Sequence, residues 1–486
     1  MEPNECQVNP PELFRVLSED QIKRIYAGTL QVLEKTGVRV YLERAVSLLG
    51  EAGCPVSDDN LVRIPSALVQ ETVASAPSRI HIANRRGEPA MVVGDNNVYY
   101  GPGEGPTYVL DPLTSERRSF CKSDARAVAR LCDALPNIDF LMGLGMISDV
   151  PRGTSDLHEF ESMLTNSTKP LVAWAHSAEN MRCMYEMCVS VAGSEAAFLD
   201  NPFLIFNAQP CSPLYHTKEA LEKLLYASEK GVPIIYTPSP TAGGTAPVTL
   251  AGLLVNSLAE NLSGVVINQV VRRGAPIIVG GGVSVMDMAT TILCYGAPEL
   301  ALASAALVEI ARYLGLPRAT TGGCTDSKIM DGQAALDATF NLLVAGISAA
   351  NLVRDIGYFE SAMTGSPELL VLANEIISMV KRIASGIRVD DETLALDVIH
   401  KVGPCGNFLT DEHTLKFFKK EVWYPQILDR RMHSGWVAQG SLTLSQRVNL
   451  RTREVLEKHT PEPLPASVLG KLERILAQGL EATAQT

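Results

Sequence analysis

Apolar residues near the start of the chain recur at helical spacing. Ser18–Gln21 has the form of a capping box, and the apolar positions that follow it end at Gly37. Those positions are Ile22, Ile25, Leu30 and Leu33. Two further amphipathic stretches, 45–53 and 66–76, repeat the pattern. We therefore expect a helical N-terminal region over residues 1–79.

The pattern changes to short runs of β-forming residues over residues 80–118. Such runs, separated by turn residues, occur at 80–83, 90–93, 98–100 and 107–110. The tight loop Gly101–Pro106 lies between the last two runs. This pattern predicts a small antiparallel β region.

From residue 119 to residue 410, helical stretches alternate with short apolar runs. The runs are Phe140–Met146, Leu171–Ala175, Phe203–Asn207, Pro233–Tyr236, Pro276–Val279, Arg318–Thr321 and Asn351–Arg354. Strands that alternate with helices are typical of parallel sheets built from βαβ units. Because nearly every run is followed by a Gly-rich or polar segment, the pattern favours a TIM (β/α)8 barrel over an open doubly wound sheet. We expect the eighth strand near His400–Gly403.

A dinucleotide-binding fold fits the chain poorly. It requires a G-x-G-x-x-G turn after an early strand, whereas Gly280–Gly282 occurs late and is followed by Val-Ser-Val-Met. Residues 411–486 follow the barrel as a second helical addition. Pro461–Pro465 separates a last helix, which we expect either to contact another copy or to pack on the surface. The expected fold class is α/β, a TIM barrel with helical N-terminal and C-terminal additions.

The composition narrows the function. The chain is 46% hydrophobic and 20% charged, which suits a large folded core, and its net charge of −12 argues against binding to nucleic acid or to an anionic membrane. The segment 1–14 has neither the basic nor the apolar region of a signal peptide, so we expect a cytoplasmic protein. The 10 cysteines form no C-x-x-C pair and no cluster with His, which predicts reduced, mostly buried thiols and no metal site.

In a TIM barrel, the segments that follow the strands carry the functional groups. In this chain they are rich in aromatic and hydrogen-bonding side chains. The candidates for substrate binding are Tyr99, Tyr100, Trp174, His176, Asn207, Gln209, Tyr236, Asp326, Lys328, Arg354, Tyr358, Phe359 and Glu360. The chain has no H-E-x-x-H, G-x-S-x-G or P-loop motif. We therefore expect residues that position a substrate, and no acid–base or nucleophilic catalytic residue.

The aromatic candidates suit a cation. Rings around a water-poor space stabilise a quaternary ammonium by cation–π attraction, although each ring taken singly is equally suited to ordinary packing. Arg354 and Lys328 each suit a substrate carboxylate. Their alternatives are structural ion pairs with Asp355 and Asp326. Asp326 is also suited to capping a helix, and His176 to bonding a backbone carbonyl.

Glycines cluster in the same segments. Gly280, Gly281 and Gly282 follow one predicted strand, and Gly322 and Gly323 follow another. Without side chains they would keep the rim low, so that a large flat molecule or another protein can approach the substrate. The alternative is that they form tight turns between strand and helix.

Three long segments carry a family resemblance. They are TGGCTDSK at Thr321–Lys328, NLVRDIGYFES at Asn351–Ser361 with TGSPELLVLANE at Thr364–Glu375, and KVGPCGNFLTDEHTL at Lys401–Leu415. With them the chain resembles, over nearly its whole length, the trimethylamine methyltransferase family of corrinoid-dependent amine methyltransferases. Within that family it is most similar to the non-pyrrolysine branch, which demethylates glycine betaine and related quaternary amines.

The resemblance implies a TIM barrel that transfers a methyl group from a substrate nitrogen to the Co(I) of a corrinoid on a separate small protein. No pyrrolysine stands in the sequence, which disfavours trimethylamine as the substrate. The corrinoid-binding pattern D-x-H-x-x-G is also missing, because Asp411-Glu-His413 lacks its Gly. A partner protein is therefore expected to carry the cofactor. A quaternary nitrogen leaves as a neutral amine, so positioning is the main requirement.

The resemblance leaves the substrate open among glycine betaine, proline betaine, carnitine and γ-butyrobetaine, with Arg354 as the clamp for the carboxylate. Gly280–Gly282, Gly322 and Gly323 would then face the corrin. Two other functions stay open: a non-catalytic betaine-binding barrel, and a barrel lyase or hydrolase acting on a small polar substrate. Association into a homo-oligomer is left open as well.

Overall fold

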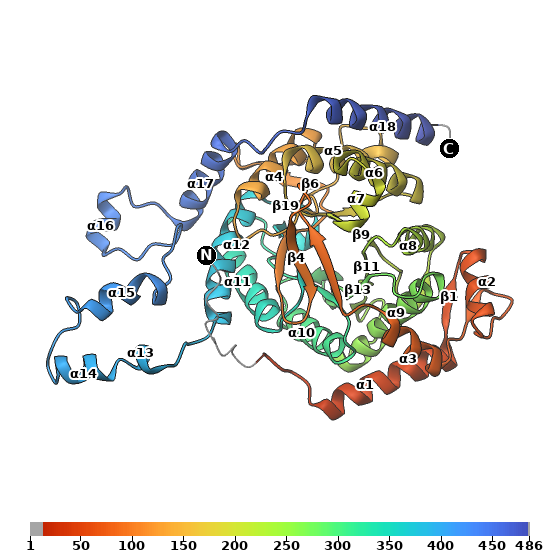
Figure 1. The fold of residues 1–486 in the computed structure, drawn as a ribbon, viewed down its shortest axis with the longest axis horizontal. Helices are drawn as coiled ribbons and strands as arrows, with labels where there is room; N and C mark the ends of the chain where they lie inside the picture. The colour runs from red at the N-terminus through yellow and green to blue at the C-terminus, as the bar shows by residue number, and fades with distance from the viewer. Residues whose placement is uncertain (1–12, 485–486) are drawn as a thin grey trace.

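The computed structural model describes residues 13–484, and its centre is a ring of parallel strands (Figure 1). Seven strands join in the order β5, β17, β16, β13, β11, β9, β8. Their bounds are β5 (Tyr99–Pro102), β8 (Leu171–Trp174), β9 (Leu204–Ala208), β11 (Ile234–Tyr236), β13 (Ile277–Gly280), β16 (Arg318–Thr321) and β17 (Leu352–Ile356). The segment 139–142 closes the ring, because Leu141 bridges Leu171 in parallel and the Asp139 N–H donates to the Tyr100 carbonyl at 2.6 Å. The chain therefore forms the predicted (β/α)8 barrel.

One barrel strand lies elsewhere than the sequence pattern predicts. The stretch expected to hold the eighth strand, near His400–Gly403, is the end of helix α14 (Leu396–Val402). The first barrel strand is instead β5, which lies in the segment 80–118 and pairs in parallel with β17. β17 comes far later in the chain, and a periodic pattern carries no information about pairing at that separation. The division of the chain into four parts stays a prediction.

Helices follow the barrel strands and cover the outside of the ring (Figure 1). They are α4 (Lys122–Ala134), α5 (Ser155–Asn166), α6 (Ala178–Ala192) with the short α7 (Glu195–Asp200), α8 (Lys218–Lys230), α9 (Leu250–Val271), α10 (Pro298–Tyr313), α11 (Gly332–Ile347) and α12 (Pro367–Ala384). Within residues 13–484, α9 is the one helix long and apolar enough to cross a membrane, but 72% of that stretch is buried in the protein. It packs against β13 and the three N-terminal helices α1 (Glu19–Gln31), α2 (Glu43–Glu51) and α3 (Ser66–Ser75), so its apolar composition serves the core.

The N-terminal region is helical, as the pattern predicts. The capping box at the start of α1 (Glu19–Gln31) is formed, with Ser18 Oγ accepting the Gln21 N–H at 3.3 Å and Gln21 Oε1 accepting the Ser18 N–H at 2.8 Å. A π-helical turn, Val32–Thr36, ends at Gly37, whose φ of 79° suits glycine. α2 (Glu43–Glu51) and α3 (Ser66–Ser75) follow, with the short strands β1 (Val38–Val40), β2 (Leu61–Val62) and β10 (Tyr215–His216) beside them.

An antiparallel hairpin, β3 (Arg79–Ala83) and β4 (Pro89–Gly94), closes the amino ends of the barrel strands (Figure 1). Its apolar side chains form one buried cluster with the lowest inward-facing side chains of the barrel. The cluster consists of Ile80, Ile82, Met91, Val93, Phe140, Met142, Val172, Ile205, Ile235, Ile278, Ala319 and Leu352, and the partly buried Tyr99 packs against it. Two residues further along the strands, the same inner face carries Asn207, Thr237, Thr321 and Arg354. The barrel therefore has an apolar floor and a polar layer above it.

The C-terminal addition has two parts. Helices α13 (Asp391–Leu394), α14, α15 (Glu412–Glu421) and α16 (His433–Ala438) form an arm that extends away from the barrel (Figure 1). Large apolar side chains of this arm are exposed, including Leu409 at 80% and Met432 at 82%. α17 (Leu444–Lys458) returns to α12 and α4, and α18 (Ala466–Ala484) lies along α5 and α6. The last helix thus packs on the barrel surface, one of its two expected roles.

Two small sheets surround the barrel mouth, which is the carboxyl end of the strands. The first has the order β18 (Tyr358–Phe359), β19 (Thr364–Gly365), β6 (Tyr108–Leu110), β7 (Arg117–Ser119). The second has the order β12 (Thr241–Ala242), β14 (Ser284–Asp287), β15 (Ile292–Cys294). Because β18 follows β17 almost directly, the first sheet fixes the chain where it leaves the barrel.

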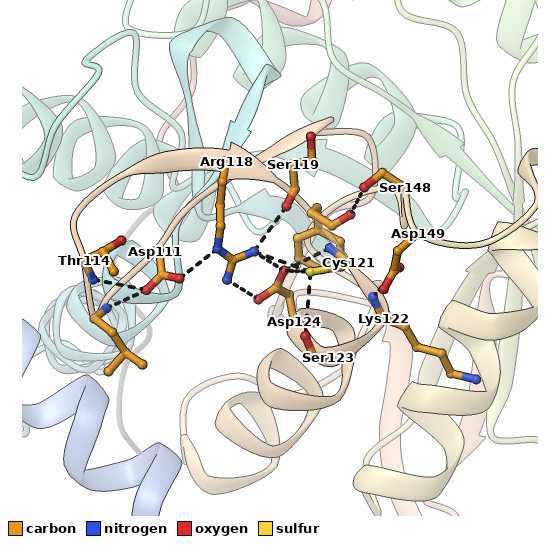
Figure 2. A network of polar contacts seen from close by, with 12 residues as sticks. Asp111, Thr114, Arg118, Ser119, Cys121, Lys122, Ser123, Asp124, Ser148 and Asp149 are labelled. Carbon is orange, nitrogen blue, oxygen red and sulfur yellow. Dashed lines mark hydrogen bonds and ion pairs between the residues drawn. The ribbon is translucent and has the colours of Figure 1, made fainter.

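Arg118 joins the β6–β7 hairpin of this first sheet to helix α4 (Figure 2). Its guanidinium donates to Asp111 at 2.8 Å and to both carboxylate oxygens of Asp124 at 2.7 Å. Asp124 also accepts the backbone N–H of Cys121 at 2.9 Å, at the start of the helix. Burial alone would raise the pKa of Asp124, but the hydrogen bonds from Arg118 and Cys121 outweigh burial and leave this pKa below its ordinary value. The network holds the rim sheet against the barrel.

Replacing Arg118 by alanine is expected to lower the free energy of unfolding at pH 7 by about 2 kcal/mol, because two largely buried carboxylates lose their partner. Urea denaturation measures the change. Since the folded-state pKa of Asp124 is lowered, its stabilising contribution is present above the unfolded-state pKa and is lost as the pH falls through the folded-state pKa. The difference between wild type and variant should therefore shrink below about pH 4.

The control for this variant is Arg451→Ala, which breaks an exposed ion pair with Glu454. It should change the free energy of unfolding by less than about 0.5 kcal/mol. Equal effects of the two substitutions at pH 7 would contradict the anchoring role of Arg118.

Candidate active site

A cavity of about 240 Å3 opens at the carboxyl ends of the barrel strands. Its walls come from the segments after β5, β9, β11, β13, β16 and β17 and from the second rim sheet: Glu104, Gly105, Gln209, Ser239, Gly282, Ser284, Leu293, Tyr295, Thr321, Arg354, Asp355 and Tyr358. Larger hollows of about 630 and 480 Å3 lie outside the barrel, the first between α1 and α9 and the second between the β6–β7 hairpin, α4 and α17. Because TIM barrels place their active sites at the carboxyl ends of the strands, the smaller cavity is the candidate active site.

Arg354 lines this cavity and is only 4% exposed. Its Nη2 donates to Thr237 Oγ1 at 3.1 Å, and its Nη1 lies 3.6 Å from Asp355 Oδ1. Asp355 also accepts the Thr321 hydroxyl at 2.7 Å. Within the described part of the chain, Arg354 Nε has no hydrogen-bond partner, and neither has Asn207 Oδ1 in the same layer. Since buried polar atoms are rarely left unpaired, this layer has donor and acceptor capacity for a bound molecule.

Two tyrosine rings also line the cavity. Tyr295 and Tyr358 meet edge to face, with their ring centroids 6.1 Å apart. The Tyr358 hydroxyl donates to the Glu104 carbonyl at 2.6 Å. Asp326 fixes the loop of Tyr295 by accepting the N–H groups of Tyr295 and Gly296 at 2.8 Å each. Burial raises the pKa of both phenols well above the ordinary value, so the cavity presents two neutral rings.

A pair of carboxyl groups lies where β5 and α5 meet. Glu104 lines the cavity, and Glu159 of α5 is 3% exposed, with no hydrogen-bond partner for its Oε1 among the described residues. Burial and, next, the charge of Asp156 raise the pKa of Glu104 to about 8. Burial and, next, the Glu104 carboxyl raise the pKa of Glu159 well above its ordinary value. At neutral pH both carboxyls therefore favour the protonated form.

Other charged groups surround this pair. Asp156, also on α5 and 3% exposed, accepts the backbone N–H of His176 at 2.7 Å and the Asn180 amide at 2.9 Å. Lys223 of α8 donates to the backbone carbonyl that precedes His176 at 2.9 Å, and its Nζ lies 5.0 Å from the centroid of the Trp174 ring. Burial lowers the pKa of Lys223. The mouth therefore carries acidic groups beside an aromatic ring at the end of β8.

The structure brings part of the predicted set together. Four predicted residues line the cavity: Gln209, Gly282, Arg354 and Tyr358. Asn207 belongs to the polar layer of the barrel interior. Trp174 and His176 stand at the end of β8, with their rings edge to face and the centroids 4.6 Å apart. His176 Nε2 lies 3.0 Å from Ser155 Oγ, so it bonds a hydroxyl rather than a backbone carbonyl. A role of these residues in substrate binding stays a prediction.

Four predicted aromatic residues lie away from the cavity. Tyr99 belongs to the apolar floor, where its hydroxyl accepts a backbone N–H at 3.0 Å. Tyr100 points to the outside of the barrel, against α11. Tyr236 also points outward, under α9, where its hydroxyl bonds His216 at 2.8 Å. Phe359 is part of the core. Neighbouring residues of a strand face opposite sides, and the apolar runs do not reveal which side faces the interior.

Three predicted polar residues have structural partners. Lys328 is exposed, does not line the cavity, and donates to the backbone carbonyl of Asp326 at 2.7 Å. Glu360 pairs with Arg117 at 2.8 Å on the rim sheet. Asp326 holds the Tyr295 loop, as described above, and does not cap a helix. Of the two predicted carboxylate clamps, Arg354 lines the cavity and Lys328 does not, and the clamp itself stays a prediction.

Of the predicted glycines, Gly282 borders the cavity. A Cβ at Gly280 or Gly281 would overlap neighbouring backbone carbonyls, and these residues have φ of 116° and 117°. A Cβ at Gly322 or Gly323 would come within 2.7 or 2.9 Å of aliphatic side chains of β17. Tight turns and close packing thus account for these four glycines, and their approach to a corrin stays a prediction.

Sequence reasoning misses several residues of the site. They are Glu104, Asp156, Glu159, Lys223 and Tyr295. Glu104 carries a usable signal, because it is a carboxyl group in a Gly-rich loop directly after a barrel strand. The other four lie within helices or in a rim loop, where the periodicity of apolar residues contains no sign of function.

Within residues 13–484, no cysteine lines the cavity. In residues 13–484, no group of three or more His, Cys, Asp or Glu side chains is arranged to hold a metal ion. The cysteines of that range are free thiols, and Cys6 lies outside the described residues. Cys324 packs behind β17, donates to the Asp355 carbonyl at 3.1 Å and has its pKa raised by burial.

Comparisons with known proteins relate the chain to amine methyltransferases. Residues 4–481 match the family described as trimethylamine methyltransferase (MTTB). The trimethylamine methyltransferase MttB of Desulfitobacterium hafniense (strain DSM 10664 / DCB-2) is 32% identical, over 95% of this chain and 93% of its own. The glycine betaine methyltransferase of D. hafniense (strain Y51) is 30% identical, over 96% and 97%. The crystal structure of the Methanosarcina barkeri monomethylamine methyltransferase (MtmB) has the same fold, with a TM-score of 0.53 over 93% of this chain and 89% of that chain at 12% identity.

Proposed function

Because this chain belongs to the trimethylamine methyltransferase family and is a methyltransferase, we propose that it removes a methyl group from a small quaternary amine that bears a carboxylate. The methyl acceptor in this proposal is the Co(I) of a corrinoid carried by a separate cognate protein. The observation that carries the proposal is Arg354, a buried cation whose Nε–H is unpaired, in a cavity that also holds two aromatic rings.

The two kinds of group in the cavity match the two ends of a betaine. The guanidinium of Arg354 suits the carboxylate, since it can donate two parallel hydrogen bonds. The rings of Tyr295 and Tyr358 suit the quaternary ammonium. The similarity to a protein named glycine betaine methyltransferase supports this substrate class, and so does the lack of pyrrolysine in the sequence. Glycine betaine, proline betaine, carnitine and γ-butyrobetaine are the candidates.

The proposed mechanism depends on positioning. A quaternary nitrogen has no lone pair, and when its bond to a methyl carbon breaks, both electrons stay on nitrogen. Arg354 would fix the carboxylate, and the neutral rings would stabilise the cation without bonding to it, which leaves one methyl group free to face the open side. The corrinoid supplies the cobalt nucleophile. The enclosing barrel wall would keep water away from the reacting groups.

The size of the cavity supports an acceptor that comes from outside. About 240 Å3 holds a small amine and cannot also hold a corrin ring. The second rim sheet and the loops next to it carry exposed apolar side chains, with Val248 at 66%, Met288 at 65% and Ile292 at 54%. Val248 and Met288 both approach Gly243, so they form one apolar patch. Such a patch suits contact with another protein.

Location and assembly belong to the same proposal. We place the enzyme in the cytoplasm, where free thiols stay reduced. The exposed apolar side chains of the arm α13–α16 favour a homo-oligomer, because a second copy would cover them.

Anaerobic mixing of the protein with cob(I)alamin and a panel of amines tests the function. The panel contains the four betaines and trimethylamine, and the loss of Co(I) absorbance reports methylation. We expect methylation with at least one betaine and none with trimethylamine. The assay is repeated with corrinoid proteins as acceptors. Binding of a betaine without methylation in both formats would favour the non-catalytic barrel, and breakdown of a substrate without cobalt would favour the lyase or hydrolase.

A further inference from the structure

The hollow of about 480 Å3 between the β6–β7 hairpin, α4 and α17, here called the side pocket, plays no part in the mechanism proposed above. None of the described residues lines both the side pocket and the barrel cavity. We propose that the side pocket is a second ligand site, which takes a monocarboxylate with an apolar body and anchors the carboxylate on Arg130. Its volume lies within the range of about 300 to 1,000 Å3 that small-molecule sites occupy.

Arg130 of α4 supplies the anchor. It lines the side pocket, and its Nε is buried with no hydrogen-bond partner among residues 13–484. No other hydrogen bond and no ion pair in that range involves its guanidinium. A guanidinium always carries its charge, and a buried N–H without an acceptor is costly. The side pocket therefore contains a cation with unused donors, which suits an anion.

The other charged groups of the side pocket have partners or face water. Arg118 pairs with Asp111 and with both carboxylate oxygens of Asp124 (Figure 2). Arg453 donates to two backbone carbonyls of the turn between β6 and β7, at 3.1 and 3.0 Å. Glu457 is exposed. Because three carboxylates line the pocket beside one unpaired guanidinium, a ligand with two negative charges is disfavoured and a monoanion is favoured.

The rest of the wall is apolar. It includes Val109, Pro112, Leu113, Val128, Pro367 and Leu456. Val109 and Val128 are buried, whereas Leu113 is 66% exposed. A ligand with an apolar body would cover Leu113, and removing this side chain from water would favour binding. A small polar anion would leave the same wall exposed.

Hydrogen bonds hold the turn between β6 and β7 in place. The Pro112 carbonyl accepts the Asn449 amide at 2.7 Å and Arg453 Nε at 3.1 Å. Within the turn, Asp111 accepts the backbone N–H of Leu113 at 2.7 Å. The turn is thus fixed to α17 without a ligand. A preformed pocket loses little conformational entropy when it binds, which favours affinity.

Octanoate is the probe for this site, and two matched ligands each lack one half of it. Acetate keeps the carboxylate without the apolar body, and 1-octanol keeps the apolar body without the charge. Calorimetric titration of the whole protein at pH 7 should give one octanoate site with a Kd of about 1 mM or tighter. Octanol should bind about tenfold more weakly or worse, and acetate not measurably. No saturable binding of octanoate, or equal affinities for octanoate and octanol, would overturn the proposal.

Variants of Arg130 test the anchor. Arg130→Ala and Arg130→Met should each weaken octanoate binding about tenfold or more and leave octanol binding unchanged. General damage to the fold would weaken both ligands alike, so this difference reports the carboxylate contact. The control is Arg126→Ala on the same helix, outside the side pocket, which breaks an ion pair of 3.8 Å with Glu161 and should bind octanoate like wild type. Equal loss of both ligands in the two Arg130 variants, or no loss, would rule out the anchor.

Two further variants locate the site. Ala127→Phe fills the side pocket from α4 and should abolish binding of octanoate and octanol in a protein that melts close to wild type. Arg354→Ala removes the cation of the barrel cavity and should leave octanoate binding unaltered. Octanoate binding that survives Ala127→Phe, or that is lost in Arg354→Ala, would place the ligand elsewhere and overturn the proposal. No measurement here needs an amine or cobalt, so the result is independent of the proposed methyl transfer.

Discussion

Arg354→Ala is expected to raise KM for a betaine about 100-fold while kcat changes by less than about tenfold. A bidentate, charge-assisted hydrogen-bond pair between Arg and a carboxylate in a buried site contributes about 3 kcal/mol to substrate binding, which corresponds to a change of about 100-fold in KM. The buried Nε of Arg354 has no partner within residues 13–484, so the bond to substrate would add to the existing contacts with Thr237 and Asp355. Initial-rate kinetics of cobalt methylation measure the effect.

A substrate without a carboxylate provides the decisive comparison. Tetramethylammonium keeps the cation and lacks the acid, so Arg354→Ala should change its KM by less than about threefold. Arg354→Lys keeps the positive charge but lacks the planar guanidinium that donates two parallel hydrogen bonds. It should raise KM for the betaine roughly tenfold. Lys328→Ala removes an exposed cation near the same mouth and should have no effect. If Arg354→Ala raised KM equally for both substrates, Arg354 would not bind the carboxylate.

Gly103→Ala is the second large effect, and we expect kcat/KM to fall about 100-fold in a protein that remains folded. A Cβ at this position would come within 2.5 Å of the Tyr358 hydroxyl and would press on Asp355. The loop must then move away from the barrel and take Glu104 with it. A shift of about 1 Å in a wall that positions the substrate can reduce the rate about 100-fold. Steady-state kinetics and a thermal melt measure activity and folding side by side.

The matched control for this substitution is Gly332→Ala, at the first residue of α11. A Cβ there meets no atom within 4 Å, so activity and melting temperature should stay close to those of wild type. If Gly103→Ala retained full activity, the loop that carries Glu104 would have no part in the site.

The fold follows from the sequence to the extent that its signals are local. The capping box at Ser18 and the alternation of apolar runs with helices predict α1 and most of the barrel correctly. The run at 98–100 is predicted as a strand and forms β5, but its place in the barrel is not predicted, because its pairing with β17 depends on residues far apart in the chain. The segment near His400 has apolar residues that resemble a strand, yet it forms a helix in the arm.

The sequence predicts cavity-lining residues where a polar or aromatic side chain lies at or directly after the end of a barrel strand. Arg354, Gln209 and Tyr358 come from such segments, and they line the cavity. Tyr236 fails the same rule, because it lies on the outer face of β11 and packs under α9. Glu159 could not be found in this way, since its position depends on how α5 packs over the mouth. Proximity to a strand end is visible in a sequence, but the direction of a side chain is not.

The apolar floor made by β3 and β4 imposes an order of events on the proposed reaction. With the amino end of the barrel packed by hydrophobic side chains, ligands exchange through the carboxyl end, where the acceptor protein would also dock. The amine must then bind before the acceptor covers the mouth. Its demethylated product must wait until the methylated acceptor has departed. A barrel closed at one end thus turns a two-substrate reaction into a compulsory-order cycle, in which the small molecule enters first and leaves last.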